Sequence, residues 1–582
     1  MTSIDTHRGI AALRDAYRRG ETAPEDVAEQ VIAAPAPQGV WIGRVEPDAL
    51  RRRARELRGR EHLPLYGIPF AVKDNIDVAG LPTTAACPAF AYPAPRTAPV
   101  VERLLAAGAM LTGKTNLDQF ATGLTGSRSP YGAVESVYGG GLIAGGSSSG
   151  SAVAVAAGLV AFALGTDTAG SGRVPAALNG IVGLKPTRGL LSTIGVVPAC
   201  RSLDCVSVFT HDIADAAAVL GVAAGPHPED PWSRTGKAQA KAPDSVLLAV
   251  ARPGTLDFEG DRGQAERYVA GCAALARLTA GADPVDVGPL LEAGGLLYEG
   301  PWVAERLADL EDFLRGHAGE VLPLTLGILR GGHRFTAADT FRAQHRLREL
   351  RAATDRLFAR ADVLALPTIP TTYTLAEIAT DPLGRNAVLG RFTQFANLLD
   401  LAVVSVPNGH TPDGRPAGLQ LIGPAFSEPT LLALAAALLG QAPPAAPPAA
   451  PPDEGLVELA VVGHHLRGEA RNGELVALGG HFARTTRTAD CYRLYRLPSG
   501  VPGLVRVAAG AGAAIEVEIW RLPSAALGTL LAGVAPPLSI GFVSTVDGPV
   551  TQGFLCEAYA TAGARDITAS GGWRAHRHEE GS

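Results

Sequence analysis

Two clusters of glycine and small hydroxyl residues lie close together in the chain. GGSSSGSA spans 145–152 and GTDTAGSGRVPA spans 165–176, with a strongly apolar segment between them. Such clusters serve different purposes in proteins: glycine-rich loops bind phosphates, Gly/Ser runs form flexible linkers, and a serine in a tight turn can act as a nucleophile. The residues around the clusters distinguish these possibilities.

The phosphate and linker interpretations fit these surroundings poorly. A Walker-type loop places a lysine after its last glycine, and no lysine follows here. A dinucleotide-binding loop needs three glycines at a fixed spacing, which Ala144 interrupts. A flexible linker is polar on both sides, whereas the segment from Ala152 to Leu164 is apolar. A hydrolase site is therefore favoured.

The hydrolase interpretation has two forms. In the first, GSSSG at 146–150 matches the nucleophile-elbow motif, with Ser148 as the nucleophile. That motif also requires an aspartate and a histidine later in the chain, and the candidate histidines are His317, His333, His345 and His410. In the second form, the two clusters act together at the ends of the apolar segment, which we expect to be one buried core helix.

Together with the upstream FAVKDNID at 70–77, the two clusters resemble the amidase signature, and the resemblance covers most of residues 60–425. It implies a catalytic triad in which Ser171 is the nucleophile, Ser147 follows a cis peptide bond and bridges the other two, and Lys73 is the base. Lys73 must be neutral for this role, although the usual pKa of lysine is about 10.4. Burial beside the apolar GIPFAV strand would lower that pKa.

The turn before Ser171 is expected to stabilise the oxyanion. It consists of small residues, and successive backbone N–H groups in such a turn can point at one spot. We expect this oxyanion hole to be formed by Thr168, Ala169 and Gly170. Asp167 and Arg173 flank the turn, and we expect them to pair and hold it rigid rather than to react.

Further features resemble one branch of this family, the allophanate hydrolases. They are the Thr-Ala pair before Gly170, the segment LLYEGPWVAERLADL at 296–310 and several stretches after residue 453. The resemblance implies that Tyr298, Arg306 and the backbone at Gly123 bind a small, planar, anionic urea derivative. An arginine holds a carboxylate through two parallel hydrogen bonds, and a tyrosine hydroxyl adds direction.

The C-terminal part carries its own share of the resemblance. The matching stretches are VVGHHLRGEARNGEL (461–475), AIEVEIWRLP (514–523) and ITASGGWRAH (567–576). In the family this domain is linked to decarboxylation of the first product, and the match to a Gly-Ala-His motif makes His465 the candidate residue. Here His464 stands where that motif has a small residue, and residues 470–472 depart from the family's Pro-Leu-Asn. Glu518 is a second candidate.

The implied reaction is hydrolysis of allophanate, in the release of nitrogen from urea or triazine rings. Ser171 attacks the terminal amide carbonyl and ammonia leaves; water then frees N-carboxycarbamate, which breaks down to CO2 and a second ammonia. No cofactor is expected, and no metal, because a serine–lysine amidase needs none and no zinc-like spacing occurs. The alternatives are an amidase for another small amide or carboxylated urea, a glutamine-amidotransferase-like subunit, and a non-catalytic scaffold.

The remaining sequence indicates an α/β layered domain that would position these residues. Strands are expected at 67–74, 245–252, 362–368, 401–407 and 418–423, and helices at 98–110 and 335–361. The resemblance implies the amidase-signature fold, a large twisted mixed sheet covered by helices on both faces. A Pro/Ala linker at 441–452 would join this catalytic domain, 1–440, to a smaller C-terminal α+β or β-rich domain, 453–582. The histidines near the C-terminus are expected to lie in a frayed tail.

Composition narrows the class of protein. The chain has 582 residues and is 47% hydrophobic, enough for a large core. Its net charge is −6 without a basic stripe, so no nucleic acid partner is expected. No membrane is expected either, because the longest apolar run is shorter than the roughly 20 residues of a bilayer span. Six scattered cysteines and no signal-peptide pattern indicate a cytoplasmic protein, and the family resemblance suggests a homodimer.

Overall fold

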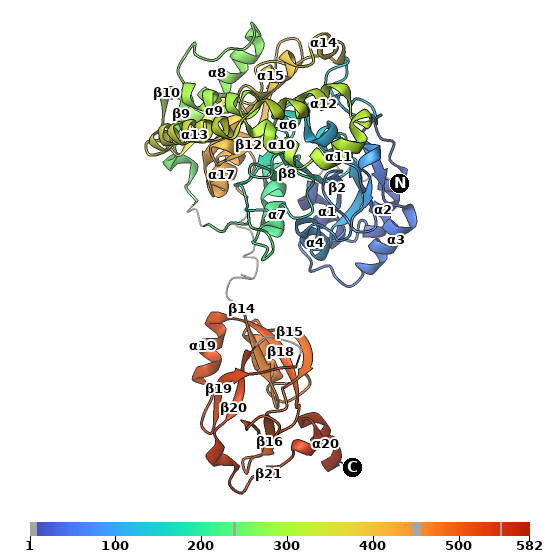
Figure 1. Cartoon of the computed structure of the whole chain (residues 1–582), viewed down its shortest axis with the longest axis vertical. Helices are drawn as coiled ribbons and strands as arrows, with labels where there is room; N and C mark the ends of the chain where they lie inside the picture. Colours follow the sequence, from blue (N-terminus) through green and yellow to red (C-terminus); the bar gives the residue numbers. More distant parts are fainter. Residues whose placement is uncertain (1–8, 237–239, 445–455, 547–549, 582) are drawn as a thin grey trace. The chain divides into compact units, whose positions relative to one another are not determined.

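The computed structural model describes residues 9–236, 240–444, 456–546 and 550–581. The chain divides into two compact units, Met1–Pro448 and Ala449–Ser582 (Figure 1). Of the expected Pro/Ala linker at 441–452, residues 445–452 lie outside the described residues. Along the described residues we find no helix that combines the length and the apolar composition of a bilayer span.

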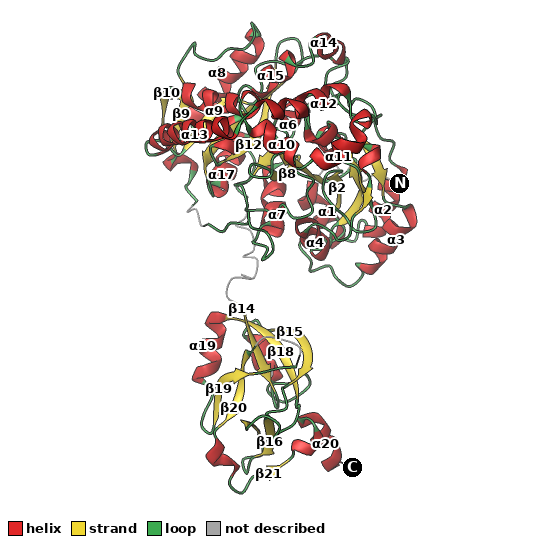
Figure 2. Cartoon of the chain, in the orientation of Figure 1, coloured by secondary structure: helices red, strands yellow, loops and turns green. Residues whose placement is uncertain are grey.

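An eleven-stranded mixed sheet runs through the first unit (Figure 2). Its strands, in spatial order, are β1 (Trp41–Arg44), β5 (Met110–Thr115), β2 (Pro69–Lys73), β6 (Phe162–Asp167), β8 (Cys205–Thr210), β7 (Val182–Lys185), β12 (Leu401–His410), β13 (Pro416–Pro424), β11 (Val363–Pro367), β9 (Leu247–Ala251) and β10 (Gly281–Val285). A separate two-stranded sheet pairs β3 (Pro82–Thr83) with β4 (Tyr92–Pro93). All five strands expected in this part of the sequence lie within the eleven-stranded sheet.

The helices of the first unit are α1 (Gly9–Arg18), α2 (Pro24–Ala33), α3 (Pro47–Glu56), α4 (Pro99–Ala106), α5 (Ser149–Ala156), α6 (Val174–Leu178), α7 (Ile213–Ala223), α8 (Arg262–Ala276), α9 (Gly288–Glu299), α10 (Trp302–Ala308), α11 (Glu311–His317), α12 (Pro323–Arg330), α13 (Ala337–Phe358), α14 (Leu375–Thr380), α15 (Gly384–Gly390), α16 (Phe395–Leu398) and α17 (Glu428–Leu438). The helix expected at 98–110 ends at Ala106, and β5 begins at Met110. The helix expected at 335–361 is α13.

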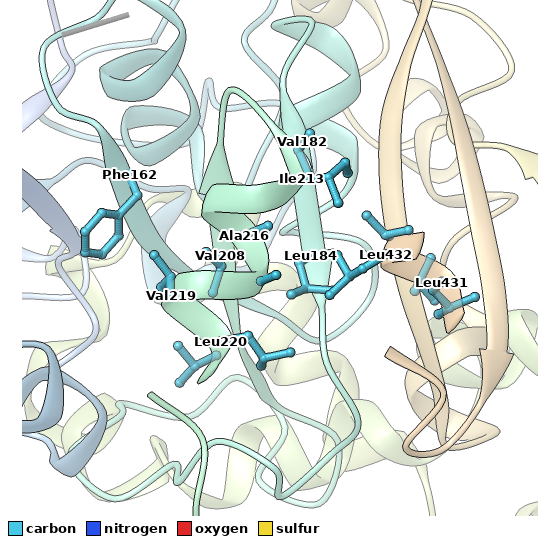
Figure 3. Close-up of a cluster of buried hydrophobic side chains, with 14 of the residues drawn as sticks. Phe162, Val182, Leu184, Val208, Ile213, Ala216, Val219, Leu220, Leu431 and Leu432 are labelled. Carbon is cyan, nitrogen blue, oxygen red and sulfur yellow. The ribbon is translucent and has the colours of Figure 1, made fainter. Parts of the chain in front are cut away.

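Helices cover both faces of the sheet because successive strand side chains point to opposite sides. Phe162 and Leu164 of β6 pack in a large core that includes residues of α4, α7 and α17. Figure 3 shows part of it, with side chains of α7 and α17 beside those of β6, β7 and β8. Ala163 instead packs in a second core with α5. The fold therefore confirms the predicted mixed sheet with helices on both faces.

The apolar run Ala152–Leu164 is not one helix, as the sequence suggested. The helix α5 ends at Ala156 and β6 begins at Phe162. Gly158 turns the chain between them with φ +65°, a conformation that glycine adopts without steric cost. The chain then returns along the helix, since Ser148 Oγ donates to Thr166 O at 3.1 Å and Ser151 Oγ to Leu164 O at 2.9 Å. This reversal brings the two Gly/Ser clusters together.

The second unit is built around a five-stranded sheet and a three-stranded sheet. The first has the order β15 (His481–Arg487), β18 (Glu516–Pro523), β14 (Leu456–Val461), β20 (Thr551–Cys556) and β19 (Leu538–Val543), and the second β17 (Pro502–Arg506), β16 (Tyr492–Arg496) and β21 (Arg565–Asp566). Its helices are α18 (Asn472–Ala477), α19 (Ser524–Ala532) and α20 (Trp573–Gly581). The expected frayed tail is wrong in part: α20 is helical, and His576 is buried against Trp573.

Candidate active site

Lys73 is the last residue of β2 and is completely buried. Its Nζ donates to Ser147 Oγ at 2.8 Å and to Thr166 Oγ1 at 2.7 Å. Burial lowers the pKa of Lys73 to about 7, against the opposing effect of nearby carboxylates, of which Asp118 acts most strongly. A lysine with this pKa is substantially neutral near pH 7 and can accept a proton.

The position of Lys73 follows from the topology of the sheet. Strands β2 and β6 are adjacent and parallel, with Val72 opposite Leu164. Their carboxyl ends therefore meet at one edge, where active sites of α/β sheets commonly lie. The turn 168–172 that follows β6 lies at this edge, as does Lys73.

Ser147 precedes α5 and follows a cis peptide bond between Gly146 and Ser147, as the resemblance implied. It is fully buried, and its carbonyl accepts a hydrogen bond from Asp118 N at 3.1 Å. Ser148, the nucleophile of the elbow alternative, is also fully buried and is engaged with the backbone of Thr166. That engagement gives Ser148 a structural role in joining α5 to β6.

Ser171 lies in the tight turn between β6 and α6 and is nearly buried. In the part of the chain that the structure describes, its hydroxyl makes no hydrogen bond. The predicted pairing of Asp167 with Arg173 is confirmed: Nε and Nη2 of the arginine lie 3.0 Å from the two carboxylate oxygens, and both side chains are fully buried. Although burial alone would raise it, the pKa of Asp167 is lowered by Arg173. A Cβ at Gly170 would overlap Thr393, which explains the glycine before Ser171.

The N–H groups of this turn are not equivalent. Gly170 N donates to Asp167 Oδ1 at 3.0 Å, so the expectation that it contributes to an oxyanion hole does not fit the geometry. Within the described residues, the N–H groups of Thr168, Ala169 and Ser171 make no hydrogen bond. The buried carboxylate of Asp204 accepts from the Thr168 hydroxyl and holds it in place.

The three residues expected to bind substrate lie together. Arg306 is only 2% exposed, its guanidinium lies over the Tyr298 ring at 5.6 Å, and its Nη1 donates to Thr122 Oγ1 at 3.0 Å, next to Gly123. Tyr298 also lines a cavity of about 430 Å³ that includes Asn386. Among the described residues, Arg306 forms no ion pair with a carboxylate. A buried guanidinium without an acidic partner is well suited to bind an anionic ligand.

Sequence reasoning missed several residues of this site. Thr166 was not among the expected site residues, yet its hydroxyl is the second partner of Lys73. Asp118 and Arg128 are both buried and lie beside Gly123. Of these, only Thr166 carried a sequence signal, since it lies within the second Gly/Ser cluster.

In the second unit, His465 lines a cavity of about 430 Å³ with His464, Arg471 and Glu474. Its ring stacks on Phe554, and Nε2 lies 3.2 Å from Glu474 Oε2. Burial lowers the pKa of His465, against the opposing effect of Glu474, and so favours the neutral ring. Arg471, where the chain departs from the family pattern, donates to both oxygens of Glu474.

Glu518, the second candidate, is fully buried with both carboxylate oxygens engaged. They accept hydrogen bonds from Arg467, Trp520 and Arg574. A carboxylate saturated in this way stabilises the fold around it. His465 is therefore the better candidate for chemistry in this unit.

Both units of the chain match known protein families. The amidase family model matches residues 35–432, and the allophanate hydrolase C-terminal domain model matches 457–578. The urea amidolyase of Saccharomyces cerevisiae is 39% identical over 95% of this chain, which covers 32% of that protein. This chain thus spans about a third of the length of the urea amidolyases that it matches.

Two further relatives match over nearly their whole length. The structure of SeMet-substituted Kluyveromyces lactis allophanate hydrolase has a TM-score of 0.70 and 38% identity, over 97% of this chain and 98% of that one. One component of the glutamyl-tRNA(Gln) amidotransferase of Symbiobacterium thermophilum is 35% identical, over 73% of this chain and 95% of that protein. Because the amidase model covers more than half of the sequence, this chain belongs to the amidase family.

Proposed function

We propose that this protein hydrolyses allophanate. The observation that carries the proposal is Arg306, a buried guanidinium without a carboxylate partner among the described residues, which lies against Tyr298. Allophanate combines a carboxylate, which a guanidinium binds in two parallel hydrogen bonds, with a terminal amide that a serine can attack. The similarity to an allophanate hydrolase over both units supports the same assignment.

In the proposed mechanism, neutral Lys73 accepts the proton of Ser147, which accepts the proton of Ser171. Among the described residues, no hydrogen bond of the Ser171 hydroxyl competes with this proton transfer. Its oxygen attacks the terminal amide carbonyl, and the N–H groups of Thr168, Ala169 and Ser171 stabilise the oxyanion. The proton returns through Ser147 to the leaving nitrogen, and ammonia departs.

Water then attacks the acyl-enzyme, with Lys73 and Ser147 again accepting the proton, and releases N-carboxycarbamate. During both steps, Arg306 holds the carboxylate end, Tyr298 offers its hydroxyl, and the backbone at Gly123 contacts the substrate. We further propose that the product is decarboxylated in the cavity beside His465. The match of this unit to the allophanate hydrolase C-terminal domain supports that assignment.

The test is ammonia release by the purified full-length protein from allophanate, biuret, propionamide and glutamine. We expect rapid release from allophanate, and its loss in Ser171→Ala with the fold retained. Preference for propionamide would favour a general amidase, and preference for glutamine an amidotransferase-like role. Release by Ser171→Ala at the wild-type rate would refute the triad.

Three organisational features are proposed with this function. They are a homodimer, a cytoplasmic location, and separate domains at 1–440 and 453–582 joined at 441–452. Light scattering on a sizing column, fractionation of cells, and limited proteolysis test them in turn. Cleavage first within 441–452, with two resistant fragments, is the result expected for separate domains.

A further inference from the structure

Asp118 lies between the base and the substrate-binding side of the site and is completely buried. Its carboxylate accepts three backbone hydrogen bonds: Oδ1 from Arg128 N at 2.9 Å, and Oδ2 from Gly126 N at 3.1 Å and Thr125 N at 3.2 Å. Among the described residues it forms no ion pair with a lysine or arginine. Backbone N–H donors therefore satisfy both carboxylate oxygens in the interior.

On the base side, Asp118 is in contact with the residues that carry Ser147. Its backbone N donates to Ser147 O at 3.1 Å. A Cβ at Gly146 would overlap Asp118 Oδ2, so the carboxylate packs directly on the peptide before Ser147. Ser147 Oγ in turn contacts Lys73 at 2.8 Å.

On the substrate side, Asp118 orders the segment 122–128. A Cβ at Gly123 would lie 2.6 Å from its Oδ2, so the carboxylate also packs against the backbone expected to contact the substrate. Thr122, at the start of the segment, accepts two hydrogen bonds: one at its hydroxyl from Arg306 Nη1, and one at its carbonyl oxygen from Arg128 Nη1. By holding the N–H groups at 125, 126 and 128, Asp118 fixes the loop on which Arg306 rests.

We propose that Asp118 is a positioning residue that serves both halves of the site at once. Its carboxylate holds the loop 122–128 beneath Arg306, and its negative charge acts on the base Lys73. The substrate half of this inference rests on the proposed function. The base half does not depend on the substrate: it rests on the contacts of Asp118 with Gly146 and Ser147 and on its electrostatic effect on Lys73.

The charged groups that act most strongly on Lys73 are not equivalent. Asp118, Asp204 and Asp167 favour its ammonium form, and Arg306 opposes it. Asp167 is neutralised by Arg173. Asp204 instead holds the turn at Thr168 and 199–200. Asp118 alone among them also accepts hydrogen bonds from the loop beneath Arg306.

Asp118→Asn tests the inference in the full-length protein through two independent readouts. The first is the rate at which phenylmethanesulfonyl fluoride sulfonylates Ser171, followed by mass spectrometry across pH. In that step the Ser171 oxygen bonds to sulfur, fluoride leaves and Lys73 takes the proton, so the midpoint of the rate reports on Lys73. The second readout is KM for allophanate at fixed pH.

We expect the labelling midpoint to move to lower pH by about one unit, because removal of a nearby negative charge disfavours the ammonium. General loosening of the site would admit water and move the midpoint the other way, toward the usual pKa of lysine. We also expect KM for allophanate to rise roughly tenfold, as loop contacts weaken. An unchanged or raised midpoint, or an unchanged KM, would overturn the proposal.

The matched control is Asp230→Asn. Asp230 is also a buried aspartate that orders a loop through three hydrogen bonds, from the Ser192 hydroxyl and from the N–H groups of Thr193 and Trp232. It is not among the charged groups that act most strongly on Lys73. We expect the labelling midpoint and KM of Asp230→Asn to match those of the wild type. If Asp230→Asn shifted them as Asp118→Asn does, the effect of Asp118 would be a general structural one, common to buried aspartates that order loops.

Failure of this inference is distinct from failure of the proposed function. If the wild type is labelled at Ser171 but releases no ammonia from allophanate, the substrate is wrong and the labelling midpoint still tests Asp118. If Asp118→Asn does not fold, Asp118→Glu keeps the charge and displaces the loop, so the midpoint should stay near that of the wild type while KM rises. If neither variant folds, the residue serves the fold alone and the proposal is refuted.

Discussion

Replacement of Arg306 by glutamine removes a positive charge from the interior while keeping a hydrogen-bonding side chain of similar length. In the free protein, Nη1 donates hydrogen bonds to Ala121 O at 3.3 Å and to Thr122 Oγ1 at 3.0 Å. Because the guanidinium has no carboxylate partner among the described residues, its loss breaks no ion pair there. We therefore expect the free energy of unfolding to be unchanged or slightly higher.

The effect on catalysis should be large and selective. A bidentate guanidinium–carboxylate contact supplies two hydrogen bonds to charged groups, each worth about 1.5–3 kcal/mol. Allowing for what glutamine recovers, the loss is about 3–4 kcal/mol, or roughly 100- to 1000-fold in kcat/KM for allophanate. A neutral amide such as propionamide does not use this contact, so its kcat/KM should stay within a few-fold of the wild type.

The assay is initial-rate ammonia release from both substrates, with urea unfolding of each variant. Arg201→Gln is the control, since Arg201 pairs with Asp309 on the surface and is 55% exposed. It should leave both substrates unaffected. An equal fall for allophanate and propionamide in Arg306→Gln would refute the reasoning, because the residue would then support the site as a whole rather than bind a carboxylate.

Other predictions follow from the same contacts. Since the pKa of Lys73 is about 7 and its neutral form is the base, kcat/KM for a neutral amide should rise as pH increases through about 7; a flat profile from pH 5 to 9 would contradict this. Lys73→Met should abolish ammonia release, yet raise the free energy of unfolding at pH 7 by about 2–4 kcal/mol, because the native state no longer has to keep a buried lysine neutral. Urea unfolding measures the change, and a less stable variant would argue against a lysine of lowered pKa. Asp167→Asn leaves Arg173 buried without its partner and should cost about 3–5 kcal/mol in urea unfolding, whereas a loss under 1 kcal/mol would show that the pair is dispensable. His465→Gln should release the first ammonia at the wild-type rate but release CO2 more slowly; a coupled assay for ammonia and mass spectrometry for CO2 measure the two rates. CO2 release at the wild-type rate would show that His465 takes no part in the reaction.

Much of the site could be predicted because its residues are adjacent in the chain. Gly170, Ser171 and Arg173 fall within one short motif, where spacing alone determines which groups share a turn. The strands could be predicted for a similar reason, since a run of residues buried on both faces reads as a continuous apolar segment. Lys73 lies at the end of such a strand, but the strand pattern did not single it out; the resemblance of residues 70–77 to the amidase signature did.

Apart from the pairing of Asp167 with Arg173, the sequence could not provide the hydrogen-bond partners of the polar groups. The N–H of Gly170 was expected to face the substrate, but the Asp167 carboxylate three residues earlier accepts it. The apolar run 152–164 was expected to be one helix, because periodicity does not separate a buried helix from a buried strand. Tertiary packing decided that it breaks at Gly158, which places Ser148 against Thr166.

The sequence, through its resemblance to the amidase signature, thus determined which chemistry to expect: a serine nucleophile, a lysine base, and an arginine for an anion. Only the tertiary structure decided the electrostatic state of these groups. Complete burial lowers the pKa of Lys73, and three carboxylates distant in the sequence partly oppose this effect. Arg306 can bind an anion because it has no carboxylate partner among the described residues. The pKa of Lys73 and the unpaired state of Arg306 among the described residues depend on which distant chain segments lie nearby. Desolvation and Coulomb energies depend on distances in space, and the sequence does not give these distances.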